Sequence, residues 1–395
     1  MLARALIFAA LALPAAAQAG ARECSDSPGR VLQLCISVDA GRAVYEVSRQ
    51  GRPVIAPSTM GLAFAGEPAV RWATLTDPRR SAVDTTWEQP WGEQRVIADK
   101  HNELQVTLGG DTPYNRRVIV TARVFDDGVG LRYSYPEIPA GKAVEVVGDS
   151  TQFRTRGANQ AWWYSAWGQE RDEYLYSETD ARRITTAETP LTLKRDDGLH
   201  VSIHEAALID FPSMLLSGDG AGTLTAKLMP WPDGVLAHKT GPFDTPWRTI
   251  IIGDTPGVLA DSRIELNLNE PNKLGDISWF KPEKYVGVWW EMHLNRSTWG
   301  SGEHHGAATA NVKSYIDFAA ENGFGSVLVE GWNEGWDGDW IAHGDKFSFT
   351  KAYPDFDIAE ITAYGRERGV KLIGHHETAG GVPNYAAQLE DAMAL

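Results

Sequence analysis

The pattern of apolar and polar residues in the 395-residue chain changes once along its length, at residues 269–283. This change constrains the fold more than any other feature. Before it, short runs of alternating apolar and polar residues recur, for example at 117–125 and 199–203, and polar turn sequences such as Asp196-Asp197-Gly198 separate them. Many short strands joined by polar turns predict a large β-sandwich. After it, apolar strand-like runs alternate with amphipathic helix-like segments, which predicts β/α units that share a parallel sheet.

The sequence therefore predicts a multi-domain β and α/β protein in four parts. Residues 1–19 are typical of a secretory signal peptide, because a basic start and an apolar run precede the small-residue triplet Ala17-Gln18-Ala19. We expect a sandwich domain at 20–268 and a linker with little regular structure at 269–283. Residues 284–395 contain the β/α units, with strands expected at 285–290, 326–329 and 370–373 and helices at 310–322, 357–368 and 384–393.

A signal peptide implies a periplasmic or secreted protein. In that oxidising environment Cys24 and Cys35 are expected to pair across two antiparallel segments, with two free thiols as the alternative. After residue 19 no stretch reaches the roughly eighteen consecutive apolar residues of a membrane span, so no membrane partner is expected. The formal net charge of -15 argues against a nucleic-acid partner.

Polar residues directly follow the third strand expected in the β/α region. The run Val370-Lys371-Leu372-Ile373 passes through Gly374 and ends on His375, His376 and Glu377. In β/α barrels, side chains at the carboxyl ends of the strands form the active site, so Glu377 is the candidate catalytic carboxylate. The alternative is that these three polar residues only cap a strand.

Three β/α units are too few to close a barrel, and the sequence ends at Leu395 within the third expected helix. A parallel sheet left open there would expose an unpaired apolar edge strand, which soluble proteins avoid. We therefore expect these residues to be the front portion of a longer protein.

Eight motifs, in this order along the chain, resemble glycoside hydrolase family 97. They are WWYSAW (162–167), EYLY (173–176), TPLTLKRDDG (189–198), HEAALIDFP (204–212), KYVGVWWEM (284–292), VLVEGWN (327–333), YPDFD (353–357) and KLIGHHET (371–378). The resemblance implies a β-super-sandwich followed by a (β/α)8 barrel, of which this chain holds the first three β/α units. It also implies a calcium-dependent enzyme, expected to be a monomer, that removes α-linked terminal glucose or galactose from oligosaccharides.

Hydrolysis of a glycosidic bond needs one carboxylic acid to protonate the leaving oxygen and a second carboxylate to activate water or to attack. By resemblance, Glu377 is a general base, which favours an inverting mechanism, and His375 and His376 bind sugar hydroxyls beside it. The resemblance places the general acid beyond Leu395. This chain alone is therefore expected to be inactive, and the alternative function is a non-catalytic carbohydrate-binding remnant.

Other candidate substrate-binding residues come from two places in the sequence. Glu330, Trp332 and Asn333 follow the second expected strand, where the tryptophan could stack on a sugar ring or equally pack a long loop. Lys194 and Asp196 could reach the sugar from the sandwich, although Asp-Asp-Gly is more often a simple hairpin turn.

The calcium assignment rests on Glu173, which resembles a calcium ligand that the sandwich contributes. A carboxylate oxygen suits that hard cation. Without the resemblance, Glu173 beside Asp172 and Arg171 would be interpreted as part of an exposed charged turn. Zinc is not expected, because His304-His305 and His375-His376 are adjacent pairs rather than the i, i+4 pair of zinc hydrolases.

Overall fold

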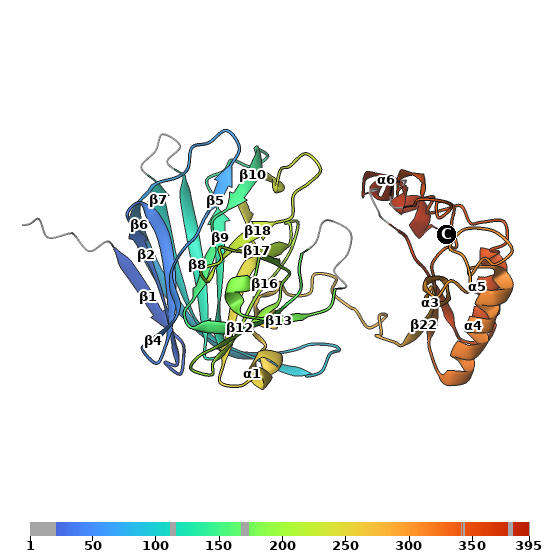
Figure 1. The fold of residues 1–395 in the computed structure, drawn as a ribbon, viewed down its shortest axis with the longest axis horizontal. Helices are drawn as coiled ribbons and strands as arrows, with labels where there is room; N and C mark the ends of the chain where they lie inside the picture. Colours follow the sequence, from blue (N-terminus) through green and yellow to red (C-terminus); the bar gives the residue numbers. More distant parts are fainter. Residues whose placement is uncertain are drawn as a thin grey trace, which may run out of the picture. The chain divides into compact units, whose positions relative to one another are not determined.

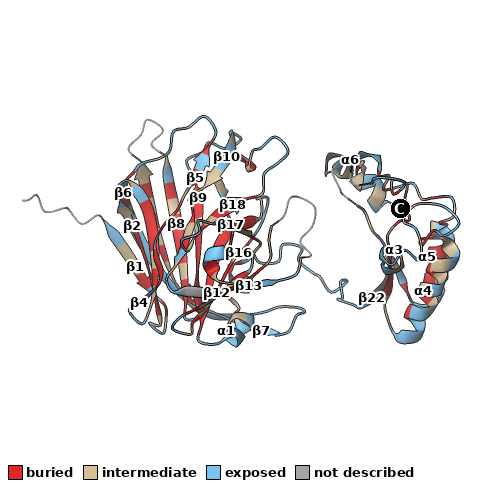
Figure 2. Cartoon of the chain, viewed as in Figure 1, coloured by how far each residue is buried: buried red, intermediate tan, exposed pale blue. Residues whose placement is uncertain are grey.

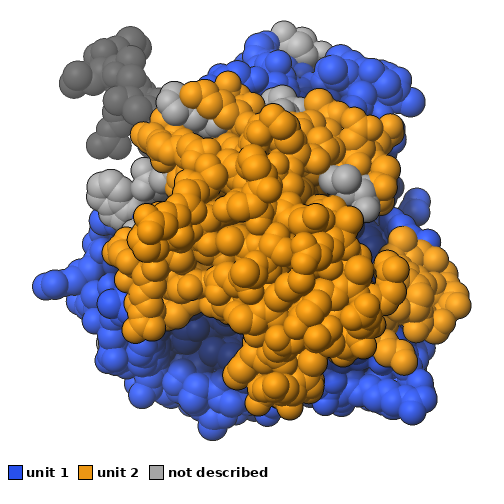
Figure 3. Space-filling view, turned by 90° about the vertical axis from the view of Figure 1, so that its right-hand side faces the viewer, with its two compact units in different colours: residues 1–273 blue, residues 274–395 orange. Residues whose placement is uncertain are grey.

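The computed structural model describes residues 21–110, 116–166, 174–340, 342, 344–377 and 382–394. The chain divides into two compact units, residues 1–273 and 274–395, which Figure 3 colours separately. The division falls within the segment 269–283 that the sequence predicts as a linker.

Unit 1 consists mainly of antiparallel strands, which Figure 1 labels in part. In chain order its elements are β1 (Arg22–Asp26), β2 (Leu32–Asp39), β3 (Arg42–Arg49), β4 (Arg52–Thr59), β5 (Leu62–Phe64), β6 (Trp72–Glu88), β7 (Val96–Gly110), β8 (Arg117–Phe125), β9 (Gly128–Tyr135), β10 (Ala143–Asp149), β11 (Gln152–Thr155), β12 (Ala158–Trp163), β13 (Ser177–Thr179), the 3-10 turn η1 (Ala181–Arg183), β14 (Thr186–Ala187), β15 (Leu191–Arg195), β16 (His200–Ala206), β17 (Met214–Gly218), β18 (Thr223–Leu228), β19 (Ala237–Thr240), β20 (Phe243–Asp244), β21 (Trp247–Gly253), α1 (Pro256–Asp261) and α2 (Ile264–Leu268).

Within the described residues, the strands of unit 1 form two large sheets and one small sheet. The eight-stranded sheet has the order β1-β2-β3-β4-β11-β18-β17-β14, and the three-stranded sheet has the order β19-β10-β5. The ten-stranded sheet runs β13-β12-β15-β16-β21-β9-β8-β7-β6, with β20 paired beside β9. Alternating side chains, such as Leu32, Leu34 and Ile36 of β2 and Val118 and Val120 of β8, meet in one core cluster. Figure 2 colours the buried residues red along these strands.

A network of buried charges ties the small sheet of unit 1 to the ten-stranded sheet. Arg248 of β21 lies 2.8 Å from an oxygen of Asp149 in β10 and 2.6 Å from an oxygen of Glu205 in β16. All three side chains are at most 4% exposed. Burial raises the pKa of Glu205, and the neighbouring Arg248 charge opposes this rise. Such a network holds three strands in one arrangement, because each charge loses its partner if a strand moves.

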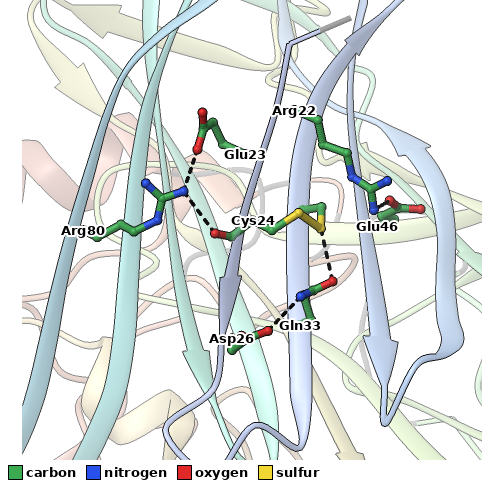
Figure 4. Close-up of a disulfide and its surroundings, with 8 residues drawn as sticks. Arg22, Glu23, Cys24, Asp26, Gln33, Glu46 and Arg80 are labelled. Atoms are coloured by element: carbon green, nitrogen blue, oxygen red, sulfur yellow. Dashed lines mark hydrogen bonds and ion pairs between the residues drawn. A yellow bond between two sulfur atoms is a disulfide. The ribbon is translucent and has the colours of Figure 1, made fainter. Parts of the chain in front are cut away.

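The predicted disulfide joins the first two strands, as Figure 4 shows. Cys24 of β1 lies directly opposite Cys35 of β2 in the antiparallel register. The same strand is also held from its other side, because Arg80 of β6 donates to Glu23 at 2.5 Å and to the Cys24 carbonyl at 3.2 Å. The N-terminal strand is thereby fixed to both large sheets.

Unit 2 contains a parallel sheet with the order β22-β23-β24. Helices α4 and α5 cover one face of it, where their apolar side chains join those of the strands in a second core cluster (Figure 1). The elements are β22 (Tyr285–Val288), α3 (Trp290–His293), α4 (Thr309–Asn322), β23 (Ser326–Val329), the 3-10 turn η2 (Gly344–Lys346), α5 (Ile358–Glu367), β24 (Lys371–Gly374) and α6 (Val382–Met393).

The local sequence explains where the helices of unit 2 begin and end. Gly323 has φ +74°, a left-handed conformation that glycine adopts without strain, and it terminates α4. Asp357 caps α5 by accepting a hydrogen bond from the Glu360 amide. One prediction is wrong in detail, because β22 ends at Val288 and not at Trp290: the chain turns at Trp289 (φ −156°, ψ −32°) and α3 follows.

The predicted fold class is confirmed: a large β-sandwich is followed by three β/α units with a parallel sheet. None of the helices in the described ranges is both long and apolar enough to cross a membrane.

Candidate active site

The carboxyl ends of the three parallel strands meet at one edge of the sheet in unit 2. Val288, Val329 and Gly374 are in register on neighbouring strands. The residues that follow continue the backbone ladder, since the Glu330 amide donates to the Val288 carbonyl at 3.2 Å and the His375 amide donates to the Val329 carbonyl at 3.1 Å. The sheet therefore places Glu330 and His375 side by side, as the predicted parallel topology requires.

His375 lies between two carboxylates at this edge. Its Nδ1 is 4.0 Å from Glu330 Oε1, and its Nε2 is 3.6 Å from Glu377 Oε2. The exposed fractions of the three side chains are 31% for His375, 19% for Glu330 and 23% for Glu377, so the group is partly shielded but open to water. Burial alone would lower the pKa of His375, but the contact with Glu377 and the charges of both carboxylates raise it above its ordinary value.

His376 lies in a different environment from its neighbour. Its ring stacks on Phe349, with the ring centroids 4.7 Å apart, and is 5.9 Å from the ring of Trp332. Burial, followed by the nearby His375, lowers the pKa of His376. At neutral pH this side chain is thus a neutral ring packed among aromatic residues rather than a second cation.

Trp332 and Asn333 are buried, with exposed fractions of 3% and 0%. The Trp332 Nε1 donates to the His375 carbonyl at 2.8 Å and so fixes the start of the segment that carries Glu377. The Asn333 Nδ2 donates to the Ser348 carbonyl at 2.6 Å, and its Oδ1 accepts from Trp336 Nε1 at 3.1 Å. These contacts are those of the packing role, and the substrate-binding role of Trp332 and Asn333 stays a prediction.

Lys194 and Asp196 belong to unit 1, whereas Glu377 belongs to unit 2. Lys194 lies in β15, paired with His200 of β16, and Asp196 is an exposed residue of the turn between these strands. Arg195 between them is buried and forms a 3.0 Å ion pair with Asp197 across the turn. These contacts are those of a well-formed hairpin, the alternative that the sequence left open.

The structure brings together several residues that sequence reasoning missed. His305 from the loop before α4 and Asp355 from the loop before α5 meet behind the end of β23. Trp299 stacks on Trp336 with the ring centroids 5.1 Å apart. The adjacent histidines 304 and 305 are the sequence signal for this cluster, but their spacing argues only against a zinc site and does not indicate Asp355 as a partner.

The described residues do not by themselves form a calcium site. Among them, no group of three or more histidine, cysteine, aspartate or glutamate side chains could hold a metal ion. Glu173, the ligand that the resemblance implies, lies outside the described residues. No part of the chemistry of the described cluster is therefore assigned to a metal.

Comparison with known proteins places both units in one family. The family description "Glycosyl-hydrolase 97 N-terminal" matches residues 26–271, and "Glycoside hydrolase 97" matches residues 289–395. A family 97 enzyme from Pseudoalteromonas sp. strain K8, whose structure was solved in complexes with panose and with acarbose, is 45% identical with a TM-score of 0.87. That match covers 94% of this chain and 57% of the other.

Two curated relatives are more distant in sequence. A probable retaining alpha-galactosidase from Streptomyces bingchenggensis is 28% identical over 87% of this chain, and a retaining alpha-galactosidase from Bacteroides thetaiotaomicron is 23% identical over 89%. The match spans 50% and 55% of those relatives, so the chain corresponds to about half of their length. With two matched family descriptions that together cover most of its residues, the chain belongs to glycoside hydrolase family 97.

Proposed function

We propose that the protein hydrolyses the terminal α-glucosidic or α-galactosidic bonds of oligosaccharides. The observation that carries this proposal is the placement of Glu377 beside His375 at the carboxyl edge of the parallel sheet, with Glu330 on the other side of the imidazole. The complexes of the Pseudoalteromonas enzyme with panose and acarbose support an oligosaccharide substrate. The names of the curated relatives support an α-linked galactose, so both sugars should be tested.

In the mechanism that we propose, Glu377 is the general base. Its carboxylate takes a proton from the water that attacks the anomeric carbon, while a separate carboxylic acid protonates the leaving oxygen. The His375 side chain, whose Nε2 lies 3.6 Å from Glu377 Oε2, helps to hold that carboxylate in place. We assign the general acid to no described residue and place it outside this chain, so the chain alone should be inactive.

The stereochemical outcome depends on what Glu377 does. A base that activates water gives inversion and needs the two carboxyl groups roughly 6.5–9.5 Å apart, whereas retention needs a nucleophile roughly 5–5.5 Å from the acid. We propose inversion for this protein, although the two curated relatives carry the word retaining in their names. NMR of the first product formed from an aryl α-glycoside distinguishes the outcomes: a β-sugar supports inversion and an α-sugar rejects it.

The hydrolysis proposal is tested by assaying the full-length protein, rather than residues 1–395 alone, on aryl α-glucosides and aryl α-galactosides. Glu377→Gln keeps the shape of the side chain and removes the base, so kcat should fall by about 10²–10⁴. Glu321→Gln, an exposed glutamate of α4, is the matched control and should leave kcat unchanged. Absence of turnover in the parent protein, or full activity of Glu377→Gln, would reject the assignment.

We further propose that the protein depends on Ca²⁺ through Glu173 and that it is exported after removal of residues 1–19. Removal of Ca²⁺ with a chelator should then abolish turnover by the parent protein until Ca²⁺ is restored. The Glu173→Gln variant should need a higher Ca²⁺ concentration for half-maximal turnover. Sequencing of the mature amino terminus should begin at Gly20. A chelator-resistant activity contradicts the calcium proposal without affecting the role of Glu377.

A further inference from the structure

His305 is a fully buried histidine whose two ring nitrogens both face oxygen atoms. Its side chain has 0% exposure. The Nδ1 lies 2.9 Å from both carboxylate oxygens of Asp355, and the Nε2 lies 2.8 Å from the carbonyl oxygen of Gly331. The imidazole and the Tyr353 ring are nearly perpendicular, with the centroids 5.3 Å apart. One side chain thus connects three segments: its own loop, the turn after β23 and the approach to α5.

The partners of His305 make it a bridge between two backbone segments. The Gly331 carbonyl oxygen only accepts hydrogen bonds, so the Nε2 donates to it. The Nδ1 shares a hydrogen with the Asp355 carboxyl group. Loss of either contact would leave a buried polar group without its partner, an arrangement that costs stability.

The carbonyl that His305 holds belongs to a tightly fixed turn. Gly331 has φ +74°, and a Cβ at this position would lie 2.7 Å from the Trp299 carbonyl oxygen. The backbone can therefore take this path only with glycine here. Glu330 immediately precedes this turn, and Trp332, which donates to the His375 carbonyl, immediately follows it.

The position of the turn decides how close Glu330 comes to His375. Because Glu330 Oε1 is 4.0 Å from His375 Nδ1, a small displacement of the turn changes this distance substantially. An electrostatic contact weakens as its two charges separate, most steeply where water replaces protein between them. The buried His305 side chain, paired with the partly exposed Asp355, anchors the turn from behind through the Gly331 carbonyl oxygen.

We propose that His305, held between Asp355 and the Gly331 carbonyl oxygen, is a positioning residue that sets the Glu330 carboxylate against His375 in the candidate active site. It does not touch the substrate and acts through the Gly331 turn. Only its consequence for catalysis rests on the proposed glycosidase function, since the positioning itself can be measured without turnover.

The test follows the imidazole signals of the full-length protein labelled with ¹⁵N-histidine, as a function of pH. In His305→Gln the titration midpoint of His375 should fall toward the ordinary histidine value of about 6.5. The Glu330 charge helps to raise the pKa of His375 in the parent protein, so a fall reports displacement of Glu330.

Two further variants separate positioning from general stability. Thr309→Val removes a hydroxyl that donates to the Asp355 backbone at 2.8 Å, and it should lower the melting temperature without moving the His375 midpoint. Asp355→Asn keeps the imidazole and should lower the midpoint in part, which keeps the test usable if His305→Gln does not fold. An unchanged or raised midpoint of His375 in the folded His305→Gln variant overturns the proposal.

The outcome is independent of the hydrolysis assay. A fall of the midpoint in a protein without glycosidase activity would support the positioning role and reject the proposed function. A constant midpoint in an active enzyme would reject the positioning role and leave the function of Glu377 intact.

Discussion

His375 and His376 are neighbours in the sequence, yet their environments drive their pKa values in opposite directions. The carboxylates of Glu330 and Glu377 outweigh burial for His375, whereas burial among aromatic rings dominates for His376. The strand explains this difference, because successive side chains at the end of an extended segment point to opposite faces. One histidine therefore faces the open carboxylate group and the other faces the packed loop.

We predict that these two histidines titrate on opposite sides of the ordinary histidine value of about 6.5. Folding raises the pKa of His375, so its protonation contributes stability below that value, and the contribution is lost as pH rises through the folded-state pKa. Folding lowers the pKa of His376, so its contribution is lost as pH falls. NMR titration measures both, and Glu377→Gln should lower the His375 midpoint only. A single shared midpoint would contradict the prediction.

At this scale the sequence predicts the type of residue better than its role. Glu377 could be proposed because a carboxylate at the end of a buried strand has few structural reasons to be there. The role of Trp332 could not be predicted, because the sequence of a long loop does not show whether a tryptophan ring faces a sugar or the core. Its burial depends on Phe356 and other partners that are distant in the sequence.

Among the elements of unit 1, the strands β10, β16 and β21 depend on a single arginine. Arg248 is the cation that Asp149 and Glu205 share, and all three are buried. The network contributes to the stability of the fold mainly because breaking it is costly. An unpaired buried carboxylate is far less stable than a paired one.

We predict that Arg248→Met destabilises the sandwich by about 3–5 kcal/mol, because it leaves two buried acids without a cation. Arg80→Met is the matched control: it breaks the partly exposed contact with Glu23, which is worth about 0–1 kcal/mol. Urea unfolding followed by circular dichroism measures both variants. Equal losses of unfolding free energy for the two variants would show that the buried network stabilises the sandwich no more than the exposed contact does.

The sequence predicts elements well where their apolar pattern is local. The helices expected at 310–322 and 357–368 correspond to α4 and α5 within one residue at each end. By contrast, β6 was missed, because most of this 17-residue strand is exposed and its sequence lacks an alternating apolar pattern. Pairing with β7 along nearly its whole length makes it a strand, and such pairing is not visible in the sequence of β6 itself.

For the molecule as a whole, the decisive property is its division into two compact units at residues 273 and 274. The sequence predicts this division because the periodicity changes from alternating strands to strand and helix. The segment 269–284 between the last helix of unit 1 and β22 is almost entirely exposed, and regular structure resumes only at Tyr285. Its backbone is thus accessible to a protease.

We predict that brief trypsin digestion of the native protein cuts first after Lys273 and Lys284 and yields two resistant fragments. Lys281 should be spared, because proline follows it. The double variant Lys273→Gln and Lys284→Gln should slow the first cleavage while leaving the melting temperature unchanged. Mass spectrometry identifies the cuts. A first cut within 32–253 would indicate that the sandwich opens more readily than the connecting segment.

The order of strands in the eight-stranded sheet has a consequence for how a growing chain folds. Strands β1 to β4 pair in sequence order, but the next partner of β4 is β11, where Ala56 meets Arg154. During synthesis the first four strands therefore present an unpaired edge until much of unit 1 has left the ribosome. Nascent chains with such delayed partners fold slowly and are prone to aggregation, so the early hairpins are where a chaperone would act.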